Sequence, residues 1–172
     1  MAQNSANYAF GLLEKYGVTG VSQDFVNQWF TIIYDELVFN PGFMPTIIQG
    51  VKEALKALKA KGLPLAVVSA HSRSVLIREA KEYGIDHLFE VFEGWSSQEK
   101  AHSLLRACRH IHVNPRQAAY FADTVYDIQS AKKAGLISVA VSTGYNPYEI
   151  LALENPDLLV RSLQEFVDKI EV

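Results

Sequence analysis

The chain has 172 residues and a mass of 19.2 kDa, which suits one compact domain or a core with a small accessory lobe. Its residues are 49% hydrophobic, 11% aromatic and 20% charged, which excludes a disordered or collagen-like chain. The net charge of −3 argues against nucleic acid as the main partner, and the single cysteine, Cys108, excludes an internal disulfide.

Two further observations bear on where the protein acts. No apolar run approaches the roughly 20 residues that a membrane span requires. The first seven residues do not have the pattern of a signal peptide. We therefore expect a soluble protein in the cytoplasm, without a membrane as partner.

The first 45 residues predict helices and no strand. Apolar side chains recur there at three- and four-residue intervals, in one stretch that ends at Gly17 and a second that runs from Ser22 to Leu37. Pro41, Gly42 and Pro45 then break the pattern. We place a domain boundary at this point, with a helical segment over residues 1–45 and a second domain over residues 46–172.

After the boundary, helices alternate with strands that are apolar throughout. The expected helices cover about residues 51–61, 73–83, 96–111 and 126–134, a short stretch from 146, and 163–170; the expected strands cover about 65–68, 88–92, 118–121, 137–141 and 158–160. This alternation is typical of an α/β fold with a parallel sheet covered on both faces. Ligands of such sheets bind beyond the carboxyl ends of the strands, so the polar residues there are the candidates for function.

Four such residues stand out, and each also has a plain structural explanation. Ser69 follows the strand 65–68 and could simply cap the next helix. Lys100 begins a helix, an unfavourable position for a cation, but could be an ordinary solvated lysine. Asp123 and Asp127 could cap a helix N-terminus. Two carboxylates beside a strand end also suit Mg²⁺, which takes one or two protein carboxylates together with phosphate oxygens.

The order of these features is more specific than any one of them. A strand ending in Ser69, then Lys100 before a helix, then Phe121-Ala122-Asp123-Thr124-Val125-Tyr126-Asp127, resembles the haloacid dehalogenase superfamily, and most of all its phosphoglycolate phosphatase type. The resemblance covers about residues 50–172. It implies a three-layer, Rossmann-like α/β core with a parallel sheet. The two preceding helices look like a truncated N-terminal helical cap.

The resemblance also implies roles for the four residues. Ser69 would bind phosphate, Lys100 would be the catalytic lysine that neutralises the phosphate and the nucleophile, and Asp123 and Asp127 would position Mg²⁺. The implied partner is a small phosphorylated metabolite. Ala122 stands where the family usually has glycine, and Ala101 stands where many relatives have proline.

The family's first motif, an apolar strand ending in Asp-x-Asp that supplies the nucleophile, has no match. No Asp-x-Asp occurs in the 172 residues. The most similar stretch is 31–37, which contains Asp35, but its apolar spacing favours a helix. We therefore expect this 172-residue chain to be a phosphatase-like protein of small phosphate esters that is impaired or inactive as a phosphatase. The alternatives are an inactive relative that binds phosphate, metal or another protein, and an unrelated doubly wound binding domain.

The missing motif leaves the central strand position of the sheet without an occupant. In the family, that strand lies between the strand ending at Ser69 and the strand ending at Asp123. Three outcomes are possible. These two neighbours pair directly; another segment fills the position, from this chain or from a second copy by strand exchange; or Met1 is not the biological start.

Overall fold

The computed structural model describes residues 10–11, 13–26, 28–29, 46–94 and 99–170. From residue 46 its elements, in chain order, are α3 (Val51–Ala60), β1 (Ala66–Val68), α4 (Arg73–Glu82), η1 (Asp86–Leu88), β2 (Val91–Glu93), α5 (Lys100–His110), η2 (Pro115–Gln117), β3 (Ala119–Ala122), α6 (Val125–Ala134), β4 (Ile137–Val141), α7 (Tyr148–Leu153), β5 (Leu158–Val160) and α8 (Leu163–Lys169). The predicted α/β architecture is confirmed.

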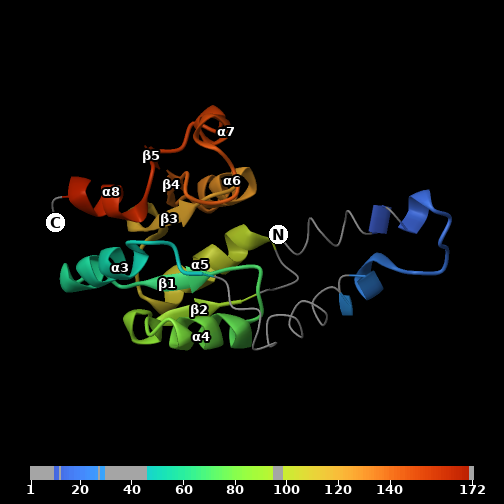
Figure 1. The fold of residues 1–172 in the computed structure, drawn as a ribbon, viewed down its shortest axis with the longest axis horizontal. Helices are drawn as coiled ribbons and strands as arrows, with labels where there is room; N and C mark the ends of the chain where they lie inside the picture. Colours follow the sequence, from blue (N-terminus) through green and yellow to red (C-terminus); the bar gives the residue numbers. More distant parts are fainter. Residues whose placement is uncertain (1–9, 12, 27, 30–45, 95–98, 171–172) are drawn as a thin grey trace.

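The strands form two parallel sheets (Figure 1). β1 pairs with β2, with Val67 opposite Phe92. β4 lies between β3 and β5. Phe121 of β3 lies opposite Val139 of β4, and Val141 of β4 lies opposite Val160 of β5. Because all pairs are parallel, the carboxyl ends of neighbouring strands lie at the same edge.

Both β1 and β3 have one edge that does not face a paired strand. Within the described residues, no backbone ladder joins these two edges. The Leu65 carbonyl accepts the N–H of Glu90, and the Ser69 N–H donates to the Glu93 carbonyl. Both groups therefore face β2. Since backbone groups alternate along a strand, Val68 directs its carbonyl to the opposite side. There it accepts the Tyr120 hydroxyl of β3 at 3.2 Å. Direct pairing of these two strands, one of the three outcomes considered, is therefore wrong, because a side chain takes the place of the backbone partner.

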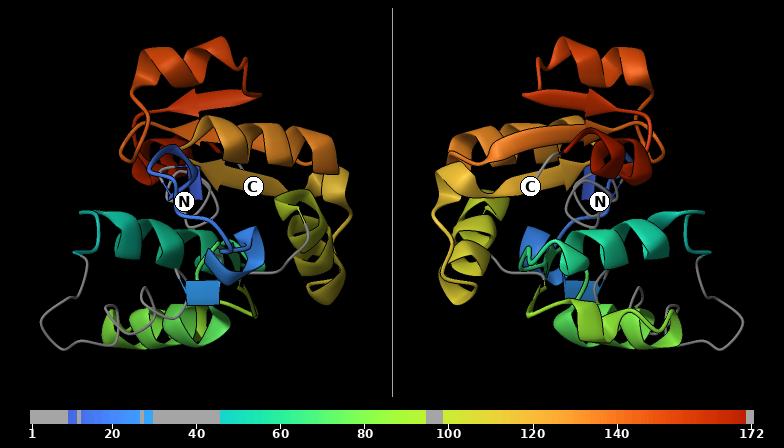
Figure 2. Two further views of the ribbon diagram at one scale, coloured as in Figure 1. Left: turned by 90° about the vertical axis from the view of Figure 1, so that its right-hand side faces the viewer. Right: turned by 90° about the vertical axis from the view of Figure 1, so that its left-hand side faces the viewer.

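Helices cover both faces of the strands (Figure 2). On one face, Ala54 and Leu58 of α3 share a buried cluster with Phe166 and Val167 of α8, and the Phe166 ring meets that of Phe121 edge-on at 4.7 Å. On the other face, α5 packs against α6 and also against β1 and β2. α5 therefore bridges the two sheets.

The expected element bounds hold to within a residue or two for most of the core. The strand expected over 88–92 is shifted: Asp86–Leu88 forms a 3₁₀ turn, with the Leu88 N–H bonded to the Ile85 carbonyl at 3.0 Å. The strand then starts at Val91. The helix expected from residue 96 is observed from Lys100, and residues 95–98 lie outside the described part.

The N-terminal segment is helical at residues 10–11, 13–15, 23–26 and 28–29. These turns lie to one side of the core (Figure 1). Residues 30–45, which include Asp35 and the boundary at 41–45, lie outside the described residues, so the division at residue 45 stays a prediction. Among the described residues, no helix is long and apolar enough to cross a membrane.

Candidate functional site

Ser69 lies at the carboxyl end of β1, as the sequence predicted. Its N–H donates to the Glu93 carbonyl at 3.0 Å, which extends the pairing with β2 by one residue. Its hydroxyl accepts the N–H of His71 at 3.3 Å. The residue that caps α4 is Ser72, whose hydroxyl accepts the N–H of Val75. The alternative of Ser69 as that helix cap is therefore wrong.

Lys100 and Asp127 form an ion pair in the interior. The ammonium Nζ lies 2.5 Å from Oδ1 of Asp127, and the two side chains are 15% and 13% exposed. Lys100 begins α5 and Asp127 lies in the first turn of α6, so the packing of these two helices brings them together. Lys100 is not the solvated lysine of the alternative explanation.

Tyr120 connects this pair to the end of β1. The Lys100 ammonium lies 5.7 Å from the centre of the Tyr120 ring, within the range of a cation–π contact. The Tyr120 hydroxyl donates to the carbonyl of Val68, the residue before Ser69. Lys100 and Asp127 are thus linked, through one tyrosine, to the strand end that carries Ser69.

Opposing effects set the charge states at this point. Burial favours neutral Lys100, but its interactions with Tyr120 and Asp127 outweigh this, and the pKa of Lys100 is raised. Burial raises the pKa of Tyr120 to about 12 despite the nearby ammonium. Because this phenol stays protonated at neutral pH, the Asp127 carboxylate is the negative charge that keeps Lys100 protonated there.

Asp123 lies just after β3 and is held by the loop that follows β4. Its Oδ2 accepts the N–H of Tyr145 at 2.9 Å, and its carbonyl accepts the N–H of Asn146 at 3.0 Å. The α6 N-terminus is capped by other side chains: Thr124 accepts the N–H of Asp127, and Asn146 accepts the N–H of Val125. Neither aspartate is therefore the capping residue of α6, although Asp127 lies in its first turn, where a carboxylate is favourable.

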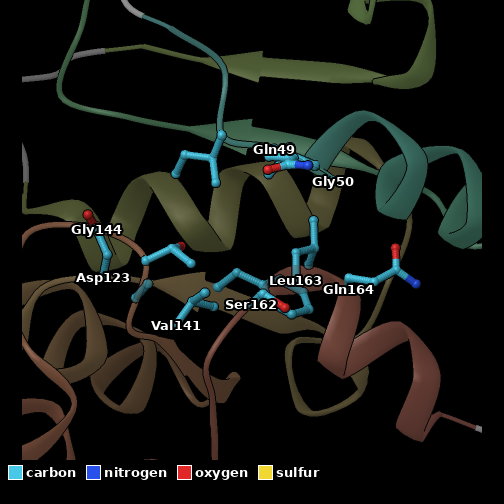
Figure 3. Close-up of a pocket in the computed structure, with 13 residues that line it drawn as sticks. Gln49, Gly50, Asp123, Val141, Gly144, Ser162, Leu163 and Gln164 are labelled. Atoms are coloured by element: carbon cyan, nitrogen blue, oxygen red, sulfur yellow. The ribbon is translucent and has the colours of Figure 1, made fainter.

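Asp123 also lines a pocket of about 200 Å³ that opens to solvent (Figure 3). The ends of β3 and β4 and the start of α8 line one side, and the residues at the start of α3 line the other. The lining residues include Phe121, Asp123, Gly144, Gln49 and Gln164. The pocket therefore lies beside the ends of β3 and β4, and of the four predicted residues Asp123 alone lines it.

The two carboxylates suit a divalent metal only as a minimal site. The described residues contain no group of three or more His, Cys, Asp or Glu side chains arranged to hold a metal ion. Mg²⁺ needs only one or two carboxylates, because water and phosphate oxygens complete its shell. Each of the two carboxylates uses one named oxygen in the contacts above, Oδ1 of Asp127 and Oδ2 of Asp123. The number of carboxylates is thus compatible with what Mg²⁺ requires.

Three residues of this region were not predicted from the sequence: Tyr120, Gly144 and Asn146. Tyr120 carries the only hydroxyl within the run 118–122, which was a usable signal. Gly144 and Asn146 follow the strand 137–141, so the rule of searching beyond strand ends also applied to them.

Sequence comparison finds a matching family model and similar curated proteins. A family model described as "Haloacid dehalogenase-like hydrolase" matches residues 11–141. "Putative pyrophosphatase PpaX" of Caldanaerobacter subterraneus subsp. tengcongensis is 33% identical over 125 residues, which cover 70% of this chain and 57% of that protein. "Phosphoglycolate phosphatase" of Chromobacterium violaceum is 31% identical over 127 residues, covering 72% and 56%. The chain thus spans little more than half the length of these curated relatives.

Solved structures share the fold. The crystal structure titled as a predicted phosphatase from Clostridium acetobutylicum superposes with a TM-score of 0.77 at 20% identity, covering 93% of this chain and 74% of that one. A predicted phosphoglycolate phosphatase from Haemophilus somnus gives a TM-score of 0.73 at 24% identity, covering 97% and 74%. At these identities the likeness concerns the fold alone.

Proposed function

Because the chain belongs to the haloacid dehalogenase-like hydrolase family, we propose that Ser69, Lys100, Asp123 and Asp127 bind a small phosphate ester together with Mg²⁺. The observation that carries the proposal is the interior pair of Lys100 and Asp127, linked through Tyr120 to the strand end at Ser69. A buried cation paired with one carboxylate, together with a hydroxyl at the end of β1 and a second carboxylate at the end of β3, is the set of groups that a phosphoryl group and a metal need.

In this proposal each side chain has a distinct task. The Ser69 hydroxyl donates to a phosphate oxygen. The Lys100 ammonium neutralises phosphate charge from a position that is only 15% exposed, where water screens it little. Asp123 and Asp127 hold the metal, which when bound supplies Lewis-acid stabilisation of the phosphoryl oxygens.

Turnover is a separate matter from binding. Phosphoryl transfer through a covalent intermediate needs a nucleophile, and no Asp-x-Asp pair occurs in this sequence. Removal of a nucleophile can reduce a rate by about 10⁶, judged from a serine protease. We propose that the 172-residue chain binds Mg²⁺ and phosphate but hydrolyses phosphate esters very slowly.

Calorimetry with Mg²⁺ and inorganic phosphate tests the binding proposal. The purified 172-residue chain should bind both, and Asp127→Asn and Lys100→Met should each weaken binding tenfold or more. Asp168→Asn is the matched control, since Asp168 is an exposed aspartate of α8 that accepts a hydrogen bond from Gln164. Equal affinities in Asp127→Asn and Asp168→Asn would contradict the assignment.

A rate measurement separates the slow enzyme from its main rival, an inactive phosphate- or metal-binding module. With Mg²⁺ and an aryl phosphate, the slow enzyme should give turnover that is small but measurable above background and that falls to background in Asp127→Asn. Turnover well above background that is lost in Asp127→Asn but kept in Asp35→Asn would disprove impaired catalysis, and would point to a nucleophile outside the residues named here. Binding without turnover favours the module, which has the same pocket.

A further inference from the structure

Gly144 differs from most glycines of the described chain. Six glycines adopt a positive φ and have open space where a Cβ would lie: Gly17, Gly20, Gly50, Gly62, Gly84 and Gly135. Gly144 differs in both respects. Its φ lies outside the left-handed range, and other atoms occupy the space where a Cβ would lie. A Cβ there would lie 1.9 Å from Oδ2 of Asp123 and 2.5 Å from the Asp123 Cβ and Cγ. Backbone conformation therefore does not require this glycine; the Asp123 side chain does.

The loop around Gly144 holds Asp123 on both sides of that contact. The next N–H along the loop, that of Tyr145, donates to Oδ2 of Asp123 at 2.9 Å. The N–H of Asn146 donates to the Asp123 carbonyl at 3.0 Å, and the Asn146 side chain accepts the N–H of Val125 at 3.2 Å. The Asp123 carboxylate thus contacts a loop that is itself hydrogen-bonded to the Asp123 backbone and to the start of α6.

We infer that Gly144 is a positioning residue, which fixes the Asp123 carboxylate in the orientation that binds Mg²⁺ by leaving it room against the loop. This inference rests on the proposed function for the role of Asp123, but the orientation itself does not depend on a metal. Gly144 and Asp123 both line the pocket (Figure 3), so the orientation set by the loop decides where the carboxylate points within it.

The size of the conflict indicates the effect of adding a side chain. Ordinary contacts of a Cβ begin at about 3.4 Å, so Gly144→Ala must displace Asp123 or the loop by roughly 1.5 Å. Turning the Asp123 side chain away breaks the bond from Tyr145. Mg²⁺ demands near-ideal geometry, and a site loosened by about 1 Å is a poor one. We expect about a tenfold or greater loss of Mg²⁺ affinity.

Two measurements on the purified 172-residue chain test the inference, with Gly11→Ala as the matched control because a Cβ at Gly11 meets nothing within 4 Å. Calorimetry with Mg²⁺ alone should show weaker binding in Gly144→Ala and no change in Gly11→Ala. In the metal-free protein, the Tyr145 amide should exchange slowly with solvent, as a response to its hydrogen bond with Asp123. That response should be lost in Gly144→Ala and kept in Gly11→Ala.

The outcomes separate the two claims. If the wild type binds Mg²⁺ and Gly144→Ala binds it equally well, or if the Tyr145 response survives in Gly144→Ala, the inference is overturned. If the wild type binds no Mg²⁺, the proposed metal site is overturned, while the Tyr145 response still decides whether Gly144 orients Asp123.

A second variant keeps the test decisive if Gly144→Ala folds poorly. The clash is with the side chain of Asp123, so Asp123→Gly should remove most of the destabilisation that Gly144→Ala causes. An urea-denaturation cycle of the two single variants and the double variant measures this coupling. Additive effects would show that the glycine serves some other contact, and would overturn the inference.

Discussion

Replacing Lys100 by methionine should destabilise the protein far more than the same replacement at Lys133. Both lysines pair with a carboxylate, but Lys100 and Asp127 are 15% and 13% exposed, whereas Lys133 and Glu99 are 62% and 58% exposed. Methionine keeps much of the length and apolar volume of lysine and removes the charge. The comparison therefore isolates the effect of burial on an ion pair.

The magnitude follows from the exposure of the pair. Breaking a fully buried pair by removing one partner costs about 3–5 kcal/mol, and exposed pairs contribute about 0–1 kcal/mol. The Lys100–Asp127 pair keeps a little solvent contact, so we expect a loss of about 2 kcal/mol. For a chain of this length that lowers the melting temperature by roughly 4–8 °C. Lys133→Met should leave the melting temperature almost unchanged.

The pH dependence gives a second, independent signature. The pKa of Lys100 is raised above its usual 10.5 in the folded protein, so the folded state binds this proton more tightly than the unfolded state. The stabilisation is complete below pH 10.5 and is lost as the pH rises through the higher folded value. The stability difference between wild type and Lys100→Met should hold up to pH 10.5 and shrink above it.

Urea denaturation at several pH values, followed by circular dichroism, measures both signatures. A cycle with Asp127→Asn should give a coupling energy close to the loss in Lys100→Met. If Lys100→Met is no less stable than Lys133→Met at pH 7, the ion pair does not stabilise the fold, and our account of it is refuted.

Two further predictions concern neighbouring contacts. Tyr120→Phe removes the hydrogen bond to the β1 carbonyl and should cost about 1 kcal/mol in urea denaturation, while the exposed Tyr145→Phe should cost almost nothing; an alkaline ultraviolet titration should also lose the phenol that ionises at about pH 12. Gly94→Ala would place a Cβ 2.3 Å from the backbone nitrogen of Arg73, so it should cost more than about 1 kcal/mol, in contrast to Gly11→Ala. Equal stability of variant and control in either case would contradict the contact concerned.

The sequence predicted the core elements well where local patterning decides them. The apolar run 137–141 and the run 158–160 are strands with the expected bounds, and the helix starting at Arg73 begins where its cap, Ser72, allows. The strand expected at 88–92 was displaced because a turn at 86–88 takes the first part of the same apolar run. Periodicity cannot separate a turn from a strand over so few residues.

The candidate site was predicted in its members but not in its contacts. Four side chains at strand and helix ends follow from the topology of a parallel sheet. That Lys100 meets Asp127, 27 positions later, depends on the packing of α5 against α6, which no local pattern encodes. The space that Gly144 leaves for Asp123 is likewise a tertiary property, since a glycine in a loop usually indicates a turn.

The division between the two sheets passes directly through the candidate site. Ser69 belongs to the sheet of β1 and β2, while Asp123 extends β3 in the other sheet. A continuous ladder would set the spacing of strand ends in steps of about 4.8 Å. Here α5 and one tyrosine hydroxyl set it instead. Within the described residues, the separation of the serine and the aspartates therefore depends on side-chain packing, and substitutions in α5 or at Tyr120 should change it while each sheet stays intact.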